Sequence, residues 1–381
     1  IICFSNVTLQ LKILEGGIEL KKIIFAILLV LLFFSPRIYW MLKPATSIDI
    51  AVVDKTVPRD DYREHNGLFW MLKNEKITRP DGELYDIGRD YFGYDPYENS
   101  PKESFDLDRT VDLIYIADTY GVYTDDLEEK ADGDRSEKIY GGMDLLEWNK
   151  LMASKGEDTT LIAEYNSFAT PTDAVTRGVM EDNLSVEWSG WAGRYFDDLN
   201  SAEVPAWLID NYENQQSKKW AFEGEGIAFV HLSDQVIVLG EDDIDGKVLF
   251  QLNEEGAKKF PKAEESTYAY WFDIVTPKND AAVLASYKLP ISENGFMTLK
   301  EAGVPWTFPA IIHHPENKTY YFAGDFADYT KTNLQKWQGS PYFMSIFSND
   351  VTNFFWSSYI PIMKDILSEI ETDKGVNEDG E

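Results

Sequence analysis

The sequence predicts an α/β fold: a mostly parallel central sheet flanked by helices, a β-rich C-terminal part with a hairpin and terminal helices, and an N-terminal transmembrane helix. Three observations predict it. Apolar strands alternate with amphipathic helices in the first half, short alternating strands follow Gly226, and an unbroken apolar run extends from Ile23 to Phe34. Strands separated by helices favour parallel pairing through right-handed crossovers. The chain has 381 residues, 44% of them hydrophobic, which is enough for a sizeable core.

The apolar run resembles a membrane anchor. It follows Lys21 and Lys22, and a second apolar patch continues it to Leu42. The whole stretch approaches the roughly 20 residues that a membrane helix needs. No small-residue cleavage site follows, so we expect an uncleaved single-pass anchor over 21–43. The lysines then stay in the cytoplasm, and the C-terminal domain is extracytoplasmic, as in a bacterial cell-membrane protein.

Residues 1–19 are expected to be a non-native upstream extension. Glu15-Gly16-Gly17 can be encoded by a bacterial ribosome-binding sequence, and Leu20 stands where a TTG start codon would lie. The prediction removes Cys3, the single cysteine of the chain, from the native protein. A domain without cysteine excludes thiol catalysis and cysteine zinc sites.

After the anchor, the chain alternates strands and helices and then becomes rich in strands. The predicted α/β elements are a strand at Ile48–Val53, a helix over 62–77, a strand at Val111–Asp118, a helix over 143–156, a strand over 159–165 and a helix that begins near Thr172 or Asp173 and runs toward Asn183. Two strands around a Pro-Glu-Asn-Lys turn predict a hairpin near His314, and aromatic helices follow it. Because no linker separates the halves, we expect one composite domain over 47–370 and a disordered acidic tail over 371–381.

Polar residues follow three of the predicted strands. In open α/β sheets, ligands bind outside the carboxyl ends of the strands. The residues are, strand by strand, Asp54 and Lys55; Asp118, Thr119 and Tyr120; Glu164, Tyr165 and Asn166. If the strands are neighbours, these side chains converge on one crevice, which Asp325 could join from a later strand.

Glu164 is the first candidate for a catalytic residue. Paired with Asp118 or Asp54, it could act as a general acid and base. The structural alternative is that these carboxylates cap helices or pair with Lys55 or Arg194. A second candidate region contains Trp188, Trp191 and Arg194. There, aromatic faces beside a guanidinium could hold a sugar ring, although ordinary packing explains the same pattern.

The order of elements from Ile48 to Asp328 resembles class I glutamine-amidotransferase-like domains, whose flavodoxin-like sheet is completed by a hairpin. In active members the corresponding turn has the form G-x-C-x-G, with cysteine as nucleophile and a His-Pro-Glu triplet near the C-terminus. This chain has AEYNSF at the turn, without the glycines or the cysteine, and His314-Pro315-Glu316 falls in the predicted hairpin turn. Without a thiolate no acyl intermediate can form, so the resemblance implies an inactive relative.

Charge and motifs limit the partners. The net charge of −31 disfavours nucleic acid and anionic lipid, which leaves neutral sugars, cations or basic groups. The stretch that begins at Glu241 lacks the glutamate that an EF-hand needs at its twelfth position, where Leu252 stands. The four histidines match no zinc motif. We therefore expect neither a metal nor a cofactor.

These observations favour a membrane-anchored extracytoplasmic domain that binds a carbohydrate or another cell-envelope component. Two alternatives stay open. One is a carboxylate-dependent hydrolase of an envelope polysaccharide, which requires two of the strand-end carboxyl groups to face each other. The other is a scaffold subunit of a membrane complex, with exposed aromatic C-terminal helices as its docking surface.

Overall fold

A ten-stranded mixed sheet organises the domain in the computed structural model, which describes residues 2–102, 109–128, 136–332, 348 and 353–378. Its strands are, in spatial order, β14 (Ser266–Tyr268), β13 (Val248–Leu252), β16 (Ala282–Lys288), β17 (Thr307–His314), β18 (Thr319–Phe322), β9 (Lys155–Ala163), β6 (Val111–Asp118), β2 (Ile50–Asp54), β4 (Phe92–Asp95) and β5 (Ser100–Pro101). The central strands β18, β9, β6, β2 and β4 pair in parallel. The remaining pairs are antiparallel.

The prediction of a mostly parallel sheet is therefore wrong, although the parallel centre is as predicted. Part of the β-rich C-terminal half, namely β13, β14 and β16 to β18, joins the parallel centre in one sheet. Its hairpin β17–β18 pairs antiparallel within itself, and β18 then joins β9 in parallel, from Thr319 beside Leu161 to Tyr321 beside Ala163. This contact adds the antiparallel strands to the same sheet.

Three smaller sheets complete the strand pairing. The four-stranded sheet has the order β12 (Val236–Leu239), β11 (Gly226–His231), β10 (Val186–Phe196) and β15 (Trp271–Pro277), all antiparallel. The two-stranded sheets pair β1 (Thr46–Ser47) with β3 (Ile77–Thr78) and β7 (Val122–Tyr123) with β8 (Lys138–Tyr140). β10 occupies the aromatic, glycine-bearing stretch for which the sequence predicted no strand. Its register shifts between Trp188 and Ala192, where Gly190 takes a φ of +88° that a side chain would strain.

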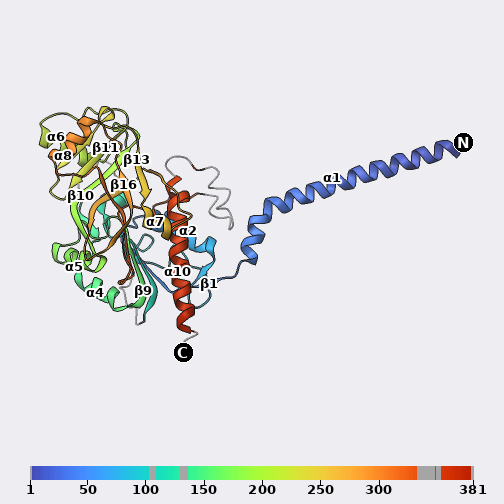
Figure 1. The fold of residues 1–381 in the computed structure, drawn as a ribbon, viewed down its shortest axis with the longest axis horizontal. Helices are drawn as coiled ribbons and strands as arrows, with labels where there is room; N and C mark the ends of the chain where they lie inside the picture. Colours follow the sequence, from blue (N-terminus) through green and yellow to red (C-terminus); the bar gives the residue numbers. More distant parts are fainter. Residues whose placement is uncertain (1, 103–108, 129–135, 333–347, 349–352, 379–381) are drawn as a thin grey trace.

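Helices lie on both sides of the large sheet, with α2 and α10 on one side in Figure 1 and α4 and α5 on the other. The helices are α1 (Ile2–Leu42), α2 (Arg63–Glu75), α3 (Thr124–Glu128), α4 (Leu145–Ala153), α5 (Ala174–Leu184), α6 (Ala206–Gln216), α7 (Glu254–Lys259), α8 (Glu293–Glu301) and α10 (Ile360–Glu378), with a 3₁₀ turn at Glu241–Asp243 and a π-helical turn at Phe355–Tyr359. α4 begins with a capping box between Asp144 and Glu147. Asp173, one of the two residues expected near the start of this helix, caps α5.

The aromatic C-terminal segment is part of the core. Its buried side chains include Phe354, Phe355, Trp356, Tyr359, Ile362 and Met363. Among the described residues of this segment there is thus no exposed aromatic surface of the kind that the scaffold alternative requires. α10 also continues through 371–378, where the sequence predicted disorder. Lys318 pairs with Asp373 at 2.7 Å, and Lys374 with Asp112 at 2.7 Å, which ties this end of the helix to the domain.

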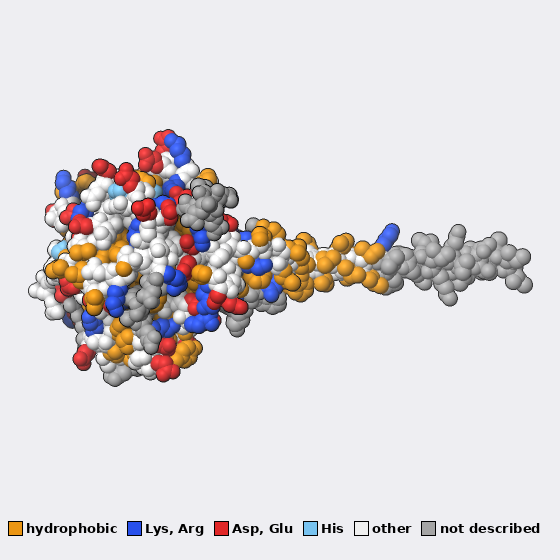
Figure 2. Space-filling view, turned by 90° about the horizontal axis from the view of Figure 1, so that it is seen from below, with side chains coloured by type: hydrophobic (Ala, Val, Ile, Leu, Met, Phe, Trp, Pro, Cys, Tyr) orange, Lys and Arg blue, Asp and Glu red, His pale blue; other side chains and the backbone are white. Residues whose placement is uncertain are grey.

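The N-terminal helix α1 projects from the domain and is apolar over most of its described side chains (Figures 1 and 2). The stretch Lys21–Leu42 is long and apolar enough to cross a membrane, and none of its most apolar window is buried. Pro36 lies inside this helix. The segment expected to be an anchor is thus a helix whose length and composition suit a membrane span.

Candidate functional site

The three strand-end carboxylates follow neighbouring strands, which meets the condition set for them to lie near one another. β2 and β6 pair with Asp54 beside Asp118, and β6 pairs with β9, which ends just before Glu164. Thr56 links the first two carboxylates, because its backbone N–H donates to Asp54 at 2.9 Å and its hydroxyl donates to Asp118 at 2.6 Å. The carboxyl edge of the parallel strands therefore gathers acidic side chains.

Asp54 is a buried partner of the first helix. Its carboxylate lies 2.5 Å from Nδ1 of His65 in α2, and neither side chain is exposed to solvent. The other ring nitrogen of His65 lies 3.1 Å from the carbonyl oxygen of Ile87. Both ring nitrogens and the carboxylate are thus used inside the protein, which fixes α2 on β2.

Glu164 is fully buried and holds the loop that follows β18. Its Oε2 accepts hydrogen bonds from the backbone N–H groups of Phe326 at 3.0 Å and Ala327 at 3.1 Å, and its Oε1 accepts one from the hydroxyl of Tyr115. Burial raises the pKa of Glu164 to about 8 against the effect of these hydrogen bonds. The residue ranked first as a catalytic acid thus supports a loop in this structure.

Asp118 is bound at three points. It accepts hydrogen bonds from Thr56, from the backbone N–H of Tyr120 at 2.5 Å and from the Asn166 side chain at 3.4 Å. Burial raises the pKa of Asp118 to about 7, and the nearby Asp54 contributes to the rise. Asn166 takes a φ of 66° at the turn after β9, and its backbone N–H donates to the buried Asp273 at 3.3 Å. Asn166 therefore bridges two buried carboxylates.

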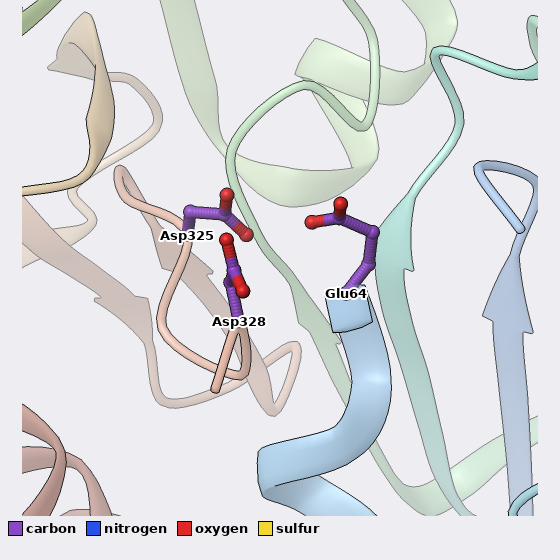
Figure 3. A group of neighbouring side chains, drawn as sticks. All are labelled: Glu64, Asp325 and Asp328. Atoms are coloured by element: carbon purple, nitrogen blue, oxygen red, sulfur yellow. The ribbon is translucent and has the colours of Figure 1, made fainter. Parts of the chain in front are cut away.

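A second acidic group lies beside this edge and forms the centre of the candidate site. Glu64 in the first turn of α2 faces Asp325 and Asp328 in the loop after β18 (Figure 3). One carboxylate oxygen from each lies within 4.8 Å of the other two, and all three residues are at most 9% exposed. We call these residues the acidic triad. The sequence pointed to Asp325 as a residue that could join this crevice but not to Glu64.

One arginine partly balances the acidic triad. A guanidinium nitrogen of Arg63 lies 3.2 Å from Glu64 and 3.1 Å from Asp328. Burial raises the pKa of all three carboxyl groups, and for Asp328 the opposing charges of Arg63 and Arg194 leave it at about 6. Three carboxyl groups this close together, balanced by the single guanidinium of Arg63, must share protons or accept further hydrogen bonds. Their oxygens could also contribute to the coordination shell of a divalent cation.

Half-buried aromatic side chains adjoin the acidic triad. The rings of Tyr165 and Trp271 stack with centroids 6.4 Å apart at an angle of 11°. The backbone N–H of Asp325 donates to the carbonyl of Trp271 at 3.3 Å, which connects the ring pair to the loop of the acidic triad. Burial raises the pKa of Tyr165 and Tyr270, and Asp325 contributes to both shifts. Both phenols therefore stay protonated and can donate hydrogen bonds.

Several other predicted ligand-binding residues are engaged elsewhere. Lys55 is buried, and its ammonium group donates to the Gly142 carbonyl at 2.7 Å and to Glu147 at 2.6 Å. Burial lowers the pKa of Lys55, although Glu147 opposes the shift. The exposed Tyr120 packs on Tyr123, with ring centroids 4.7 Å apart.

The predicted tryptophan cluster serves packing. Trp188 donates to the carbonyl of Trp191 at 3.0 Å, and the ring of Trp191 packs on His231 at 5.0 Å. Arg194 pairs with Glu203 at 2.6 Å, but its charge also acts on Asp328. Ordinary packing therefore accounts for the two tryptophans. Arg194 lies close enough to the candidate site for its charge to act on Asp328.

The sequence position of Arg63 and Glu64 indicates that they lie near the site. Arg63 and Glu64 open the helix that follows the first strand, and residues at this junction point to the same sheet edge as the strand ends. Trp271 begins a strand in the half of the chain that the sequence did not connect to this edge. β15 pairs with β10, with Trp271 beside Arg194, and the pairing of β18 with β9 brings the loop of Asp325 and Asp328 to the same edge.

Comparison with known proteins identifies no family for this chain. No family model and no curated protein matches the sequence. Among solved structures, similarity was found to "Cytoplasmic Protein STM3548 from Salmonella typhimurium", with a TM-score of 0.38 and 9% identity, covering 84% of this chain and 98% of that one. An exo-β-1,4-mannosidase, Op5Man5, from Opitutaceae bacterium strain TAV5 has a TM-score of 0.28 and 11% identity, covering 82% of this chain and 35% of that one.

A third structure, a thuA-like protein from Bacteroides uniformis ATCC 8492, has a TM-score of 0.32 and 11% identity, covering 79% of this chain and 94% of that one. At these TM-scores none of the likenesses carries an argument about function.

Proposed function

We propose that this chain is a membrane-anchored, extracytoplasmic domain that binds a carbohydrate of the cell envelope at the acidic triad. The observation that carries the proposal is the position of three nearly buried carboxyl groups beside the half-buried ring pair of Tyr165 and Trp271. Sugars present hydroxyl donors and apolar C–H faces together. Carboxylates accept from the hydroxyls, and aromatic faces pack against the C–H groups.

The hydrogen-bonding capacity of the acidic triad supports a ligand that brings donors. A carboxylate can accept about four hydrogen bonds. Arg63 supplies donors to Glu64 and Asp328. Sugar hydroxyl groups would supply more without adding negative charge to a site that is already acidic.

Charge narrows the ligand class. The net charge of −31 and the raised pKa values of the acidic triad disfavour anionic polysaccharides, because each added negative charge would meet unfavourable electrostatics. Neutral glycans and glycans that carry amino groups fit the site best. The apolar helix α1 supports attachment at the membrane, where envelope glycans are within reach.

Binding measurements on the full chain test the proposal. We expect hits for neutral or amino-bearing envelope glycans on a glycan array. For the best hit, isothermal titration should show affinity losses of about tenfold or more for Asp325→Asn and Trp271→Ala. The matched controls are Asp242→Asn and Trp306→Ala, which change exposed residues of the same types. Absence of any glycan binding, or equal losses in the controls, would contradict the proposal.

A hydrolase that uses the acidic triad is the second candidate. Its support is the spread of pKa values: burial raises the pKa of Glu64 and of Asp325 well above the ordinary value but that of Asp328 only to about 6, so a protonated carboxyl group can lie beside an ionised one at neutral pH. However, carboxyl groups of glycosidases are separated by about 5 to 9.5 Å to admit the reacting groups, and the oxygens of the acidic triad lie within 4.8 Å. Binding is therefore favoured. Release of reducing sugar by the wild-type chain, abolished by Glu64→Gln, would support hydrolysis instead.

A further inference from the structure

The last turns of α1 are bound to the folded domain. The indole N–H of Trp40 donates to the carbonyl of Lys73 at 3.0 Å. Lys76 donates to the carbonyl of Lys43 at 2.6 Å and to that of Met41 at 3.2 Å, and Lys43 forms an ion pair with Glu75. The end of α1 is thus held by the C-terminal end of α2. We call residues 36–43 the elbow, because α1 bends as it nears the domain (Figure 1) and Pro36 interrupts its hydrogen bonding.

The other face of the elbow is apolar and exposed. Leu42 is 79% exposed, Tyr39 64% and Met41 62%, and Ile38 is exposed as well. Soluble proteins rarely leave such a continuous apolar face uncovered. In this chain the face continues directly from the exposed apolar residues of the proposed membrane span (Figure 2).

The length of the apolar run indicates that lipid contacts the exposed apolar face of the elbow. Lys22 to Ser35 is a stretch of about 14 residues, which rises about 21 Å in an α-helix. The hydrocarbon core of a bilayer is about 30 Å thick. The helix before Pro36 is therefore roughly 9 Å shorter than the hydrocarbon core. The apolar face of the elbow can span the remaining thickness.

The chemistry of the bound face fits the level of the lipid headgroups. The guanidinium of Arg37 lies 4.9 Å from the ring centre of Trp40, and the ammonium of Lys76 lies 5.2 Å from it. Tryptophan and tyrosine are enriched at the membrane–water interface, and long basic side chains reach from there to the headgroups. These residues place the elbow at the boundary between headgroups and acyl chains.

We propose that the elbow is a membrane-seating surface: its apolar face lies in the phospholipid layer while its opposite face holds the domain, so that the α2 end of the domain rests on the headgroups in a fixed orientation. The partner is the phospholipid bilayer itself. The inference rests on the membrane anchor and is independent of sugar binding.

Spin labels on the full chain test this orientation. In a Cys3→Ser background, nitroxides are placed at Leu29→Cys in the proposed span, at Leu42→Cys in the elbow and at Leu146→Cys, an exposed apolar residue of α4. The chains are reconstituted in vesicles of phosphatidylethanolamine and phosphatidylglycerol. We expect the ratio of accessibility to oxygen over a water-soluble nickel complex to be several-fold higher at positions 29 and 42 than at position 146.

The outcomes separate the elbow from the anchor. Lipid exposure at position 29 with water exposure at position 42 would overturn the elbow and retain the anchor, and water exposure at both positions would overturn both. If a second copy of the chain covers the elbow, spin–spin broadening at position 42 should disappear on dilution with unlabelled protein, and that result would also overturn the proposal. Tyr39→Asp combined with Leu42→Asp, which leaves the bound face intact, should make position 41, labelled as Met41→Cys, water-accessible.

Discussion

At the scale of single residues, Glu164 shows how a buried carboxyl group can support a site without touching a ligand. Its carboxyl group fixes the backbone of Phe326 and Ala327, between the two aspartates of the acidic triad. With a pKa raised to about 8 by burial, Glu164 is mostly protonated at pH 7. A protonated carboxyl group has nearly the same shape as an amide and, like an amide, both donates and accepts hydrogen bonds.

Replacement of Glu164 should therefore show whether the shape or the charge of its carboxyl group stabilises the fold. We expect Glu164→Gln to cost less than about 1 kcal/mol of unfolding free energy at pH 7, because the amide oxygen can accept from the loop and the amide NH₂ can donate to the Tyr115 hydroxyl once that hydroxyl turns to donate to Tyr359. Glu164→Ala should cost about 2 to 5 kcal/mol, since it leaves a cavity and two buried N–H groups without an acceptor. Chemical denaturation measures both values. Equal losses in the two variants would mean that the group is ionised in the folded protein.

The position of such carboxylates was predictable from the sequence, but their roles were not. Buried runs such as Val111–Asp118 mark parallel strands, and the polar residue at each strand end falls on the same edge. Whether that residue faces a ligand or a partner depends on contacts from distant segments. Asp54 contacts His65, and Glu164 accepts hydrogen bonds from the loop after β18. No local sequence pattern predicts either contact.

At the scale of elements, close packing between α2 and the loop after β18 sets the geometry of the acidic triad. The backbone N–H of Gly67 donates to the carbonyl of Ala327 at 2.9 Å. A Cβ at position 67 would lie 2.7 Å from that oxygen and 2.6 Å from the ring of Phe355. Glycine is thus required for α2 to approach the loop.

Gly67→Ala should push α2 away from the loop and separate Glu64 from Asp328. The gain in helix propensity of about 1 kcal/mol is outweighed by overpacking, so we expect a net loss of about 1 to 3 kcal/mol in thermal or chemical unfolding and weaker ligand binding. Gly178→Ala in α5 is the matched control, because nothing lies within 4 Å of its added Cβ. That change should stabilise the protein by up to about 1 kcal/mol. A neutral Gly67→Ala would show that the helix and the loop are not tightly packed.

The sequence predicted the helices and the parallel strands well but not the sheet as a whole. Apolar periodicity and caps such as Asp173 are local, so α2, α4, α5 and the hairpin lie where expected within a few residues. The mixed sheet follows from the pairing of β18 with β9, which joins segments more than 150 residues apart. Propensity contains no information about such partners, and Trp271 was therefore not connected to the site.

At the scale of the whole molecule, the buried carboxyl groups make stability depend on pH. Burial raises the pKa to about 8 for Glu164, about 7 for Asp118 and Asp273, and about 6 for Asp328. Between pH 5 and 8 the folded state therefore binds more protons at these groups than the unfolded state. By linkage the unfolding free energy falls as pH rises through this window.

Denaturation curves at a series of pH values should show this decline, with each group contributing at most about 1.4 kcal/mol per pH unit. Repulsion within a chain of net charge −31 acts in the same direction, so the wild-type curve alone does not isolate the buried groups. Glu164→Gln isolates the contribution of one buried group, because it removes that titrating group. The plot of unfolding free energy against pH should then be flatter between pH 5 and 8. An unchanged slope in this variant, or stability that rises with pH, would contradict the assignment.

The central claim is that the acidic triad and the Tyr165–Trp271 pair together form a sugar site. The most direct measurement is an experimental structure of the full chain with the tightest-binding envelope oligosaccharide. We expect a sugar ring packed on Trp271 or Tyr165, with its hydroxyl groups hydrogen-bonded to Asp325 or Asp328. A sugar bound at a distance from these residues, for instance beside Trp188, would contradict it.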